Sequence, residues 1–304
     1  SYLLPFYDEE GKAYVTVVEG CNHRCSFCVV PRTRGPEICK PLPDVLAEVR
    51  ALVARGILEV ELLGQTVNAF RDERGRRLGD LLRAVAEIDG LRRLRFTTSH
   101  PAQMTDSLID AMATARPKVC PYLHLPVQSG SSSVLRAMRR GYDREGYLGR
   151  VARLRERYPA IALGTDVVAG FPGEGEREFE ETLTLLEEVG FDTVYAFAYS
   201  PRPGTEALAL GDPVPGEEKL DRLARLQARQ KALQAARNRV WVGRTLEVLV
   251  EGRSKKRAWE ACGRTPQNRV VNFSGAPRPG TIVAVEILGS SAYSLGGRLA
   301  PPAP

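Results

Sequence analysis

The chain has 304 residues, of which 43% are hydrophobic and 26% are charged. This apolar content suffices for a large core and excludes both a disordered chain and a small disulfide-stapled domain. The 43 basic and 37 acidic residues give a net charge of +6, which permits nucleic-acid binding without establishing it. Since the sequence has neither a membrane-length apolar run nor a basic-then-apolar leader, we expect a cytoplasmic protein with no membrane partner.

From residue 13 to about residue 211, short apolar runs alternate with amphipathic stretches, a pattern typical of β/α units and a parallel sheet. The expected strands are residues 13–18, 58–63, 94–98, 122–125, 161–168 and 193–198. The expected helices are residues 43–55, 78–88, 105–115, 131–139, 144–158 and 176–189. We predict an α/β fold, a partial (β/α)6 TIM-like barrel, with a doubly wound sheet as the alternative.

The alternation of apolar runs and amphipathic stretches ends at the helix-breaking sequence Gly-Asp-Pro-Val-Pro. A long helix is expected after it, over residues 215–240. Short β-runs separated by Gly and Pro follow at residues 246–250, 270–273, 282–287 and 293–296, and they predict a small antiparallel β-barrel. We therefore expect a core domain over residues 11–240 and the β-barrel over residues 241–304. Because the chain starts at Ser1 without Met, residues 1–10 are interpreted as a linker from a missing N-terminal domain.

Three cysteines with the spacing C-x3-C-x2-C follow the first expected strand directly: Cys21, Cys25 and Cys28. Three thiolates can bind three irons of a 4Fe-4S cluster and leave the fourth iron open to a chelating ligand such as S-adenosylmethionine (SAM). The alternative is a Cys3His zinc site, for which His23 is awkwardly spaced as the fourth ligand. The other three cysteines lie in unrelated segments and are interpreted as bystanders: Cys39, Cys120 and Cys262.

With Phe27 before its last cysteine, the cysteine motif resembles the signature of the radical SAM superfamily. The resemblance implies a reduced cluster that cleaves SAM to methionine and a hydrogen-abstracting 5′-deoxyadenosyl radical, with no catalytic side chain needed beyond the cluster and SAM. Within the superfamily, further strings resemble tRNA methylthiotransferases of the MiaB type, and these are residues 29–35, 62–69, 96–101, 123–131, 166–174 and 199–205.

The resemblance implies SAM-binding residues in and after the expected strands: Phe27, Gly64, Gln65, Ser99, Gln128, Asp166, Gly170, Phe171 and Tyr199. The superfamily often has Gly-Gly-Glu at the end of the second strand, where this chain has Gln65, which can hydrogen-bond without a carboxylate's charge. The residues alone leave other interpretations open. Gly64 and Gly170 can be turn residues, Asp166 can be a helix cap, and His124 alternates with apolar neighbours as a core histidine does.

The last sixty or so residues resemble the TRAM domain, a small RNA-binding β-barrel attached to tRNA-modifying enzymes. The predicted RNA contacts are Arg253, Lys255, Lys256, Arg257, Arg264, Asn268 and Arg269. Arginine forks can bind phosphates, and amide side chains supply neutral donors. Trp259 and Phe273 can stack on bases or belong to the core, and the basic run at residues 255–257 can also be a solvated face.

Taken together, the resemblance implies an enzyme that adds a 2-methylthio group to N6-isopentenyladenosine beside the anticodon. Its expected cofactors are one 4Fe-4S cluster and SAM, and its expected partners are a tRNA anticodon stem-loop and a reducing electron donor, with the chain monomeric. Such enzymes hold a second, sulfur-donating cluster in an upstream domain, so we expect this chain to cleave SAM without completing methylthiolation. The alternatives are methylthiolation of threonylcarbamoyladenosine or of a ribosomal-protein aspartate, and a metal-stapled RNA-binding module without catalysis.

Overall fold

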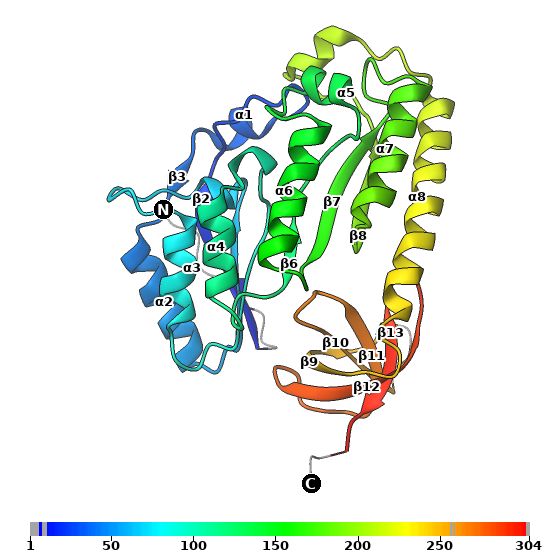
Figure 1. The fold of residues 1–304 in the computed structure, drawn as a ribbon. Coiled ribbons are helices and arrows are strands. Elements are labelled where there is room, and N and C mark those ends of the chain that lie inside the picture. Colours follow the sequence, from blue (N-terminus) through cyan, green and yellow to red (C-terminus); the bar gives the residue numbers. More distant parts are fainter. Residues whose placement is uncertain (1–5, 8–10, 256, 258, 302–304) are drawn as a thin grey trace.

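The structure is a computed structural model that describes residues 6–7, 11–255, 257 and 259–301. A large α/β domain carries a small β-barrel at one end, and the long helix α8 (Gly216–Arg239) runs along the α/β domain beside the other helices and ends at the barrel (Figure 1). No helix within the described ranges has the length and apolarity needed to cross a bilayer.

Six parallel strands form the wall of the α/β domain: β2 (Lys12–Glu19), β4 (Glu59–Gly64), β5 (Arg93–Phe96), β6 (Tyr122–His124), β7 (Ala162–Ala169) and β8 (Thr193–Ala198). The first three pair in one sheet and the last three in another, and a parallel bridge from Leu94 to Val119 joins the two. The strands thus follow chain order without the reversal of a doubly wound sheet. The prediction of a partial (β/α)6 barrel is confirmed.

Helices cover the outside of this wall: α2 (Leu42–Ala54), α3 (Leu78–Ala86), α4 (Asp106–Thr114), α6 (Arg144–Arg157) and α7 (Glu176–Val189), while the short α5 (Ser132–Ala137) lies at the carboxyl end of the strands (Figure 1). Each lies within two residues of its predicted bounds, because caps fix the ends. The Thr105 and Asp143 side chains accept the first free amides of α4 and α6, and Gly190 ends α7 with a left-handed φ of 58°.

Three short elements of the core domain have no signal in the sequence: β1 (Phe6–Tyr7), α1 (Val30–Arg34) and β3 (Ile38–Cys39). Both strands pair antiparallel with β2, so the parallel sheet has antiparallel additions. The linker predicted at residues 1–10 is described only at residues 6–7, where it forms β1; the rest lies outside the described residues.

The small domain is a closed barrel of five strands: β9 (Thr245–Arg253), β10 (Glu260–Arg264), β11 (Val270–Ser274), β12 (Ile282–Ser290) and β13 (Leu295–Leu299). The predicted small β-barrel is confirmed, and its strands pair antiparallel except for β11 and β13, which pair in parallel. β10 was not expected, since Glu-Ala-Cys-Gly-Arg contains no β-branched residue. Phe273 is fully buried in the barrel core, whereas Trp259 is 74% exposed.

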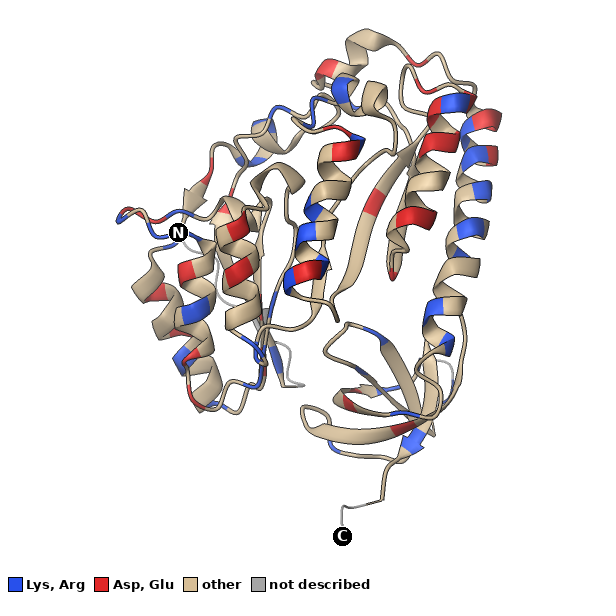
Figure 2. Ribbon diagram, in the orientation of Figure 1, with Lys and Arg blue, Asp and Glu red and all other residues tan. Residues whose placement is uncertain are grey.

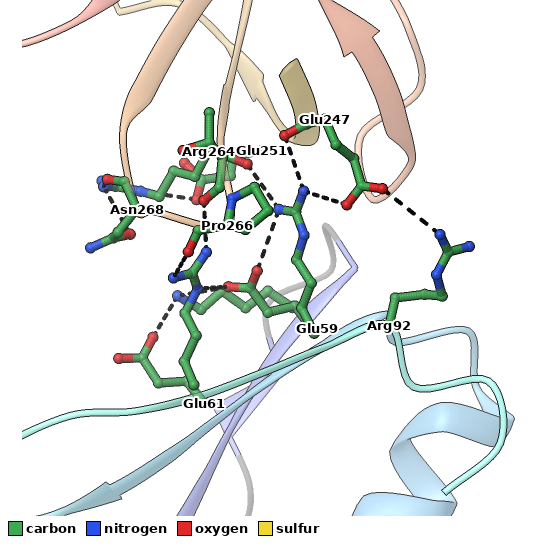
Figure 3. A network of polar contacts seen from close by, with 12 residues as sticks. Glu59, Glu61, Arg92, Glu247, Glu251, Arg264, Pro266 and Asn268 are labelled. Carbon is green, nitrogen blue, oxygen red and sulfur yellow. Dashed lines mark hydrogen bonds and ion pairs between the residues drawn. The ribbon is translucent and has the colours of Figure 1, made fainter. Parts of the chain in front are cut away.

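A buried polar network joins the two domains (Figure 3). Glu59, 1% exposed at the start of β4, accepts a 2.9 Å hydrogen bond from Arg95 and lies 3.6 Å from Lys12 and 3.7 Å from Arg93. The two arginines donate across the boundary, Arg95 to the carbonyls of Thr265 and Pro266 and Arg93 to the carbonyl of Arg264. Since β4 and β5 begin here, the small barrel docks at the amino ends of the strands, away from their carboxyl ends.

Candidate active site

Almost all the residues predicted for the cluster and for SAM follow the carboxyl ends of the parallel strands. The cysteine loop follows β2, Gly64 and Gln65 end β4, Ser99 follows β5, Gln128 follows β6, Gly170 and Phe171 follow β7, and Tyr199 follows β8. In Figure 1 this is the end of the barrel near α1 and α5, opposite the small domain. Carboxyl ends of barrel strands are where such folds build their active sites.

The cysteine loop is held in place by neighbouring strands and by α5. The Gln65 amide oxygen accepts the Gly20 N–H at 2.7 Å, and the Thr66 hydroxyl lies 3.3 Å from the Cys21 sulfur. Gly20 has a φ of 76°, and a side chain there would collide with the Pro36 carbonyl. Farther along, Ser26 donates its N–H to the Met138 carbonyl at 3.1 Å and its hydroxyl to the Ala137 carbonyl at 2.8 Å. The loop is therefore anchored independently of any metal.

Arg140, which the sequence did not single out, contacts this loop. Its guanidinium donates to the Cys25 sulfur at 3.2 Å, to the Pro126 carbonyl at 3.1 Å and to the Tyr142 hydroxyl oxygen at 3.0 Å. The side chain is buried, and it forms no ion pair with a carboxylate of the described residues. A buried cation of this kind calls for negative charge nearby, which metal-bound thiolates supply.

The residues present fit an iron–sulfur cluster better than a single zinc ion. Among the residues that the structure describes, no three His, Cys, Asp or Glu side chains are placed to hold one metal ion. His23, the proposed fourth zinc ligand, stacks instead on His100 with ring centroids 3.8 Å apart. A zinc ion needs donors that converge on one point, whereas each cluster thiolate binds its own iron. Three cysteines on one loop, one of which accepts a hydrogen bond from the buried Arg140, match the second case.

Several buried polar atoms at this end of the barrel have no hydrogen-bond partner among the described residues. They are Ser99 Oγ, Tyr199 OH, His23 Nε2 and His100 Nε2. Burial, with the charge of Arg140, lowers the pKa of His100 to about 2, so this imidazole stays neutral. Buried polar groups are normally paired, so unpaired ones gathered at one end of a barrel point to a polar ligand. The donor set suits the polar groups of SAM.

Two residues next to the site have a left-handed backbone that their side chains disfavour. Thr98 has a φ of 71° and Gln128 a φ of 75°. The Thr98 carbonyl accepts the Val67 N–H at 2.8 Å, and Gln128 extends the sheet through bonds with Asp166 and Val168, both at 2.9 Å. A β-branched residue in this region is rare, and such strain is concentrated at functional sites. No sequence signal identifies Thr98.

Of the remaining residues predicted to bind SAM, some have exposed surface at the site and others are buried in the packing behind it. Phe27 meets Phe171 edge-on at 6.4 Å, and Phe171 meets Tyr199 at 5.1 Å between ring centroids. Since Phe171 has no exposed area, it supports the wall rather than lining it. Asp166 lies in the middle of β7 rather than near its end, 3.3 Å from His124 Nε2. This contact supports the interpretation of His124 as a partnered core histidine.

Two glycines of the predicted SAM set are required by close packing. Gly170 has a φ of 74°, and a Cβ there would collide with the Lys219 side chain. A Cβ at Gly64 would lie 2.9 Å from the Val18 carbonyl oxygen. Packing alone therefore requires glycine at both positions, whether or not they contact SAM.

Five of the predicted RNA contacts line one cleft of about 950 Å³ between the small barrel and the core domain: Arg253, Lys255, Arg257, Arg264 and Asn268. Arg264 also pairs with Glu251 at 3.1 Å, and Arg257 pairs with Glu260 at 3.0 Å. Arg253 and Lys255 are exposed and form no ion pair within the described part of the chain. Lys256 lies outside the described residues.

Arg269 does not join this cleft. Its guanidinium is buried against Asp192, just before β8, and against Asn238 of α8. Arg237 of α8 also donates to Asp192, at 2.9 Å. The predicted RNA contact at Arg269 is therefore corrected, because its charge is already neutralised at the junction of the two domains. Figure 2 shows mainly acidic residues on α7 beside mainly basic residues on α8. There Arg225 and Arg229 of α8 pair with Glu176 and Glu187 of α7.

Comparisons with known proteins bear on this arrangement. The radical SAM superfamily profile matches residues 15–186, and the TRAM domain profile matches residues 239–300. A tRNA-2-methylthio-N(6)-dimethylallyladenosine synthase of Aromatoleum aromaticum is 50% identical over 98% of this chain and 68% of its own length. The protein of the same name from Methylococcus capsulatus is 50% identical over 95% of this chain and 64% of its own. The chain thus spans about two thirds of the length of these relatives.

Solved structures resemble the fold at much lower sequence identity. The radical SAM methyltransferase TsrM from Kitasatospora setae, solved with cobalamin and a [4Fe-4S] cluster, has a TM-score of 0.54 at 20% identity and covers 64% of this chain and 38% of its own. The Escherichia coli coproporphyrinogen III oxidase HemN, a radical SAM enzyme, has a TM-score of 0.55 at 15% identity over 95% of this chain and 71% of its own. At these identities the likeness concerns the fold alone.

Proposed function

Because the chain belongs to the radical SAM superfamily and, within it, to the family of the tRNA-2-methylthio-N(6)-dimethylallyladenosine synthases, we propose that it supplies the SAM-cleaving and tRNA-binding part of their reaction. That reaction adds a 2-methylthio group to N6-isopentenyladenosine beside the anticodon of tRNA. The observation that carries the proposal is the anchored loop of Cys21, Cys25 and Cys28, which faces the buried cation of Arg140 at the carboxyl ends of the strands.

In this proposal Cys21, Cys25 and Cys28 hold a 4Fe-4S cluster. When bound, the cluster would supply the electron for reductive cleavage of SAM, and the radical formed from SAM would abstract hydrogen from the base. The protein's own residues bind and orient the cofactor. Ser99 and Tyr199 have unpartnered polar atoms for it, and the Gln65 amide, braced by Gly20, presents a neutral donor. Phe27 and the Phe171 ring that it contacts form an apolar side of the cofactor site and exclude water from it.

The cleft between the domains gives the RNA a place to bind. Arg253 and Lys255, exposed and unpaired within the described residues, are the candidates for phosphate contacts. Tyr195 lines the same cleft, and Tyr195 and Phe197 of β8 are half exposed on one face of the strand, at the open edge of the barrel. Exposed aromatic rings are stacking platforms for unpaired bases. We propose that they receive the anticodon loop on its way to the site.

The chemical test is anaerobic reconstitution of the chain with iron and sulfide. About four of each per chain, with 5′-deoxyadenosine released from SAM on reduction by dithionite, is the expected result. The matched variant Cys25→Ala should lose both. Tight zinc binding by the wild type, with no 5′-deoxyadenosine, contradicts the proposal and favours a metal-stapled RNA-binding module.

The substrate test is mass spectrometry of tRNA from a host that lacks the gene. We expect the 2-methylthio group to vanish while N6-isopentenyladenosine remains, and the gene to restore it. Loss of methylthiolation at threonylcarbamoyladenosine instead, with the isopentenyl nucleoside still methylthiolated, refutes the substrate assignment without touching the radical chemistry.

A further inference from the structure

Arg140 is a buried cation that contacts the sulfur of a cysteine in the metal-binding loop. The side chain is 6% exposed, and three of its N–H groups are used by Cys25, Pro126 and Tyr142. Other buried arginines of the described chain have carboxylate partners, as Arg222 has in Glu174 at 3.1 Å. Arg140 has none within the described ranges. Burying an unpaired guanidinium is costly, so its position calls for a function.

The backbone turn after α5 and a hydrogen bond to Tyr142 fix the position of this guanidinium. Arg139 adopts a left-handed φ of 56°, which ends α5 and turns the chain so that the Arg140 N–H bonds the Leu135 carbonyl at 3.0 Å. The Tyr142 hydroxyl, which accepts from Arg140, donates to the Val127 carbonyl at 3.0 Å. These contacts orient one guanidinium N–H toward the Cys25 sulfur. All of them are made by the protein itself, so the orientation of the guanidinium does not depend on a ligand.

The cysteine loop does not need Arg140 to stay where it is. Ser26 holds the loop through its N–H and its hydroxyl, which bond the carbonyls of Met138 and Ala137. The Cys28 N–H bonds the Cys25 carbonyl at 3.1 Å and closes the turn within the loop. Removing the Arg140 side chain therefore takes away a charge, the N–H···S bond and the bonds to Pro126 and Tyr142, while the bonds that Ser26 and Cys28 make in the loop remain.

We propose that Arg140 is a positioning residue that raises the reduction potential of the cluster bound by the three cysteines. The inference rests on the cluster of the proposed function. Reduction adds one electron from an external donor to the oxidised cluster, and no bond of the chain forms or breaks. Hydrogen bonds to the sulfurs and nearby charge are among the factors that set the potential of an iron–sulfur cluster. Both the N–H of Arg140 and its positive charge favour the more negative, reduced state.

The experiment is a redox titration of the reconstituted chain with dithionite, followed by electron paramagnetic resonance of the reduced cluster. We expect Arg140→Met to shift the midpoint potential to a more negative value. The matched control is Arg136→Met, which removes a charge from the exposed side of α5 and should leave the potential of the wild type. An unchanged potential in Arg140→Met, or an equal shift in Arg136→Met, overturns the inference.

A second readout is the gain in melting temperature when the cluster is loaded. If the cluster neutralises Arg140, loading should stabilise the wild type more than it stabilises Arg140→Met; an equal gain contradicts the inference. Should Arg140→Met fail to hold a cluster, Arg140→Gln removes the charge but keeps an N–H donor, and a potential equal to that of the wild type is then the refuting result. A wild-type chain that binds no cluster overturns the proposed function itself, and this inference with it.

Discussion

Replacing Glu59 with glutamine removes the negative charge at the centre of the network that joins the two domains. The variant keeps the shape of the side chain and one acceptor for the Arg95 N–H, which lies 2.9 Å from Glu59 Oε1. It leaves Lys12, Arg93 and Arg95 buried around a neutral group. Glu61 still pairs with Lys12 at 2.6 Å and Glu247 with Arg93 at 2.9 Å, so the loss falls mainly on Arg95, at the surface on which the small barrel docks.

The magnitude follows from the burial of the groups. Side chains of Glu59, Arg93 and Arg95 are 1%, 3% and 4% exposed, so solvent screens their charges little. Breaking a buried ion pair by removing one partner costs about 3–5 kcal/mol. Because glutamine retains an acceptor, we expect about 3 kcal/mol, a large share of the roughly 5–15 kcal/mol by which a domain is usually stable.

The assay is urea unfolding followed by two probes, since urea, unlike guanidinium, adds no salt. Both tryptophans lie close to the small domain, Trp241 at the end of α8 and Trp259 between β9 and β10, so their fluorescence reports on it. Far-ultraviolet circular dichroism reports on the helices of the core domain. We expect the two transitions to coincide in the wild type and the fluorescence transition to move to lower urea in Glu59→Gln.

The matched control is Glu156→Gln, which removes a carboxylate from the exposed face of α6 and should change stability by no more than about 0.5 kcal/mol. If Glu59→Gln unfolds at the same urea concentration as this control, with coincident transitions, the network does not hold the domains together. The reasoning from burial would then be refuted.

Three further predictions concern pH, packing and RNA. Burial alone would raise the pKa of Glu59, but the charges of Arg95, Lys12 and Arg93 outweigh it and hold the pKa below 4.5. The stabilisation is therefore complete above pH 4.5 and is lost as the pH falls through the depressed folded-state value, so the stability gap between wild type and Glu59→Gln should narrow in acid; a gap that widens in acid has the wrong sign. Gly170→Ala should cost about 1–3 kcal/mol in thermal unfolding, because the left-handed backbone and the Lys219 side chain leave no room for a Cβ, and an unchanged melting temperature contradicts that packing. Lys255→Gln should reduce the slope of log Kd against log salt for an anticodon stem-loop by about 1, whereas Arg269→Gln should lower stability and leave the slope unchanged; the reverse result would return Arg269 to the RNA surface.

The pattern of the chain was sufficient for the fold class and for most of the core elements. Periodicity and cap residues locate α7 and β8 without error, because local sequence sets both their hydrophobic faces and their ends. The cysteine spacing placed the loop of Cys21, Cys25 and Cys28 after β2, since all three ligands lie on one short segment. The missed elements are short or lack β-branched residues, as β10 does, and are stabilised by their neighbours rather than by their own sequence.

What the tertiary structure alone decided is which residues meet across the chain. Arg140 lies 115 residues after Cys25 and has no motif to mark it, yet the turn after α5 brings its guanidinium to that sulfur. Arg269 belongs by sequence to a basic stretch, but folding buries it against Asp192, 77 residues away. In both cases the function of an arginine depends on which charge the fold sets beside it. A sequence pattern records the residue's own charge, and only long-range packing supplies the partner.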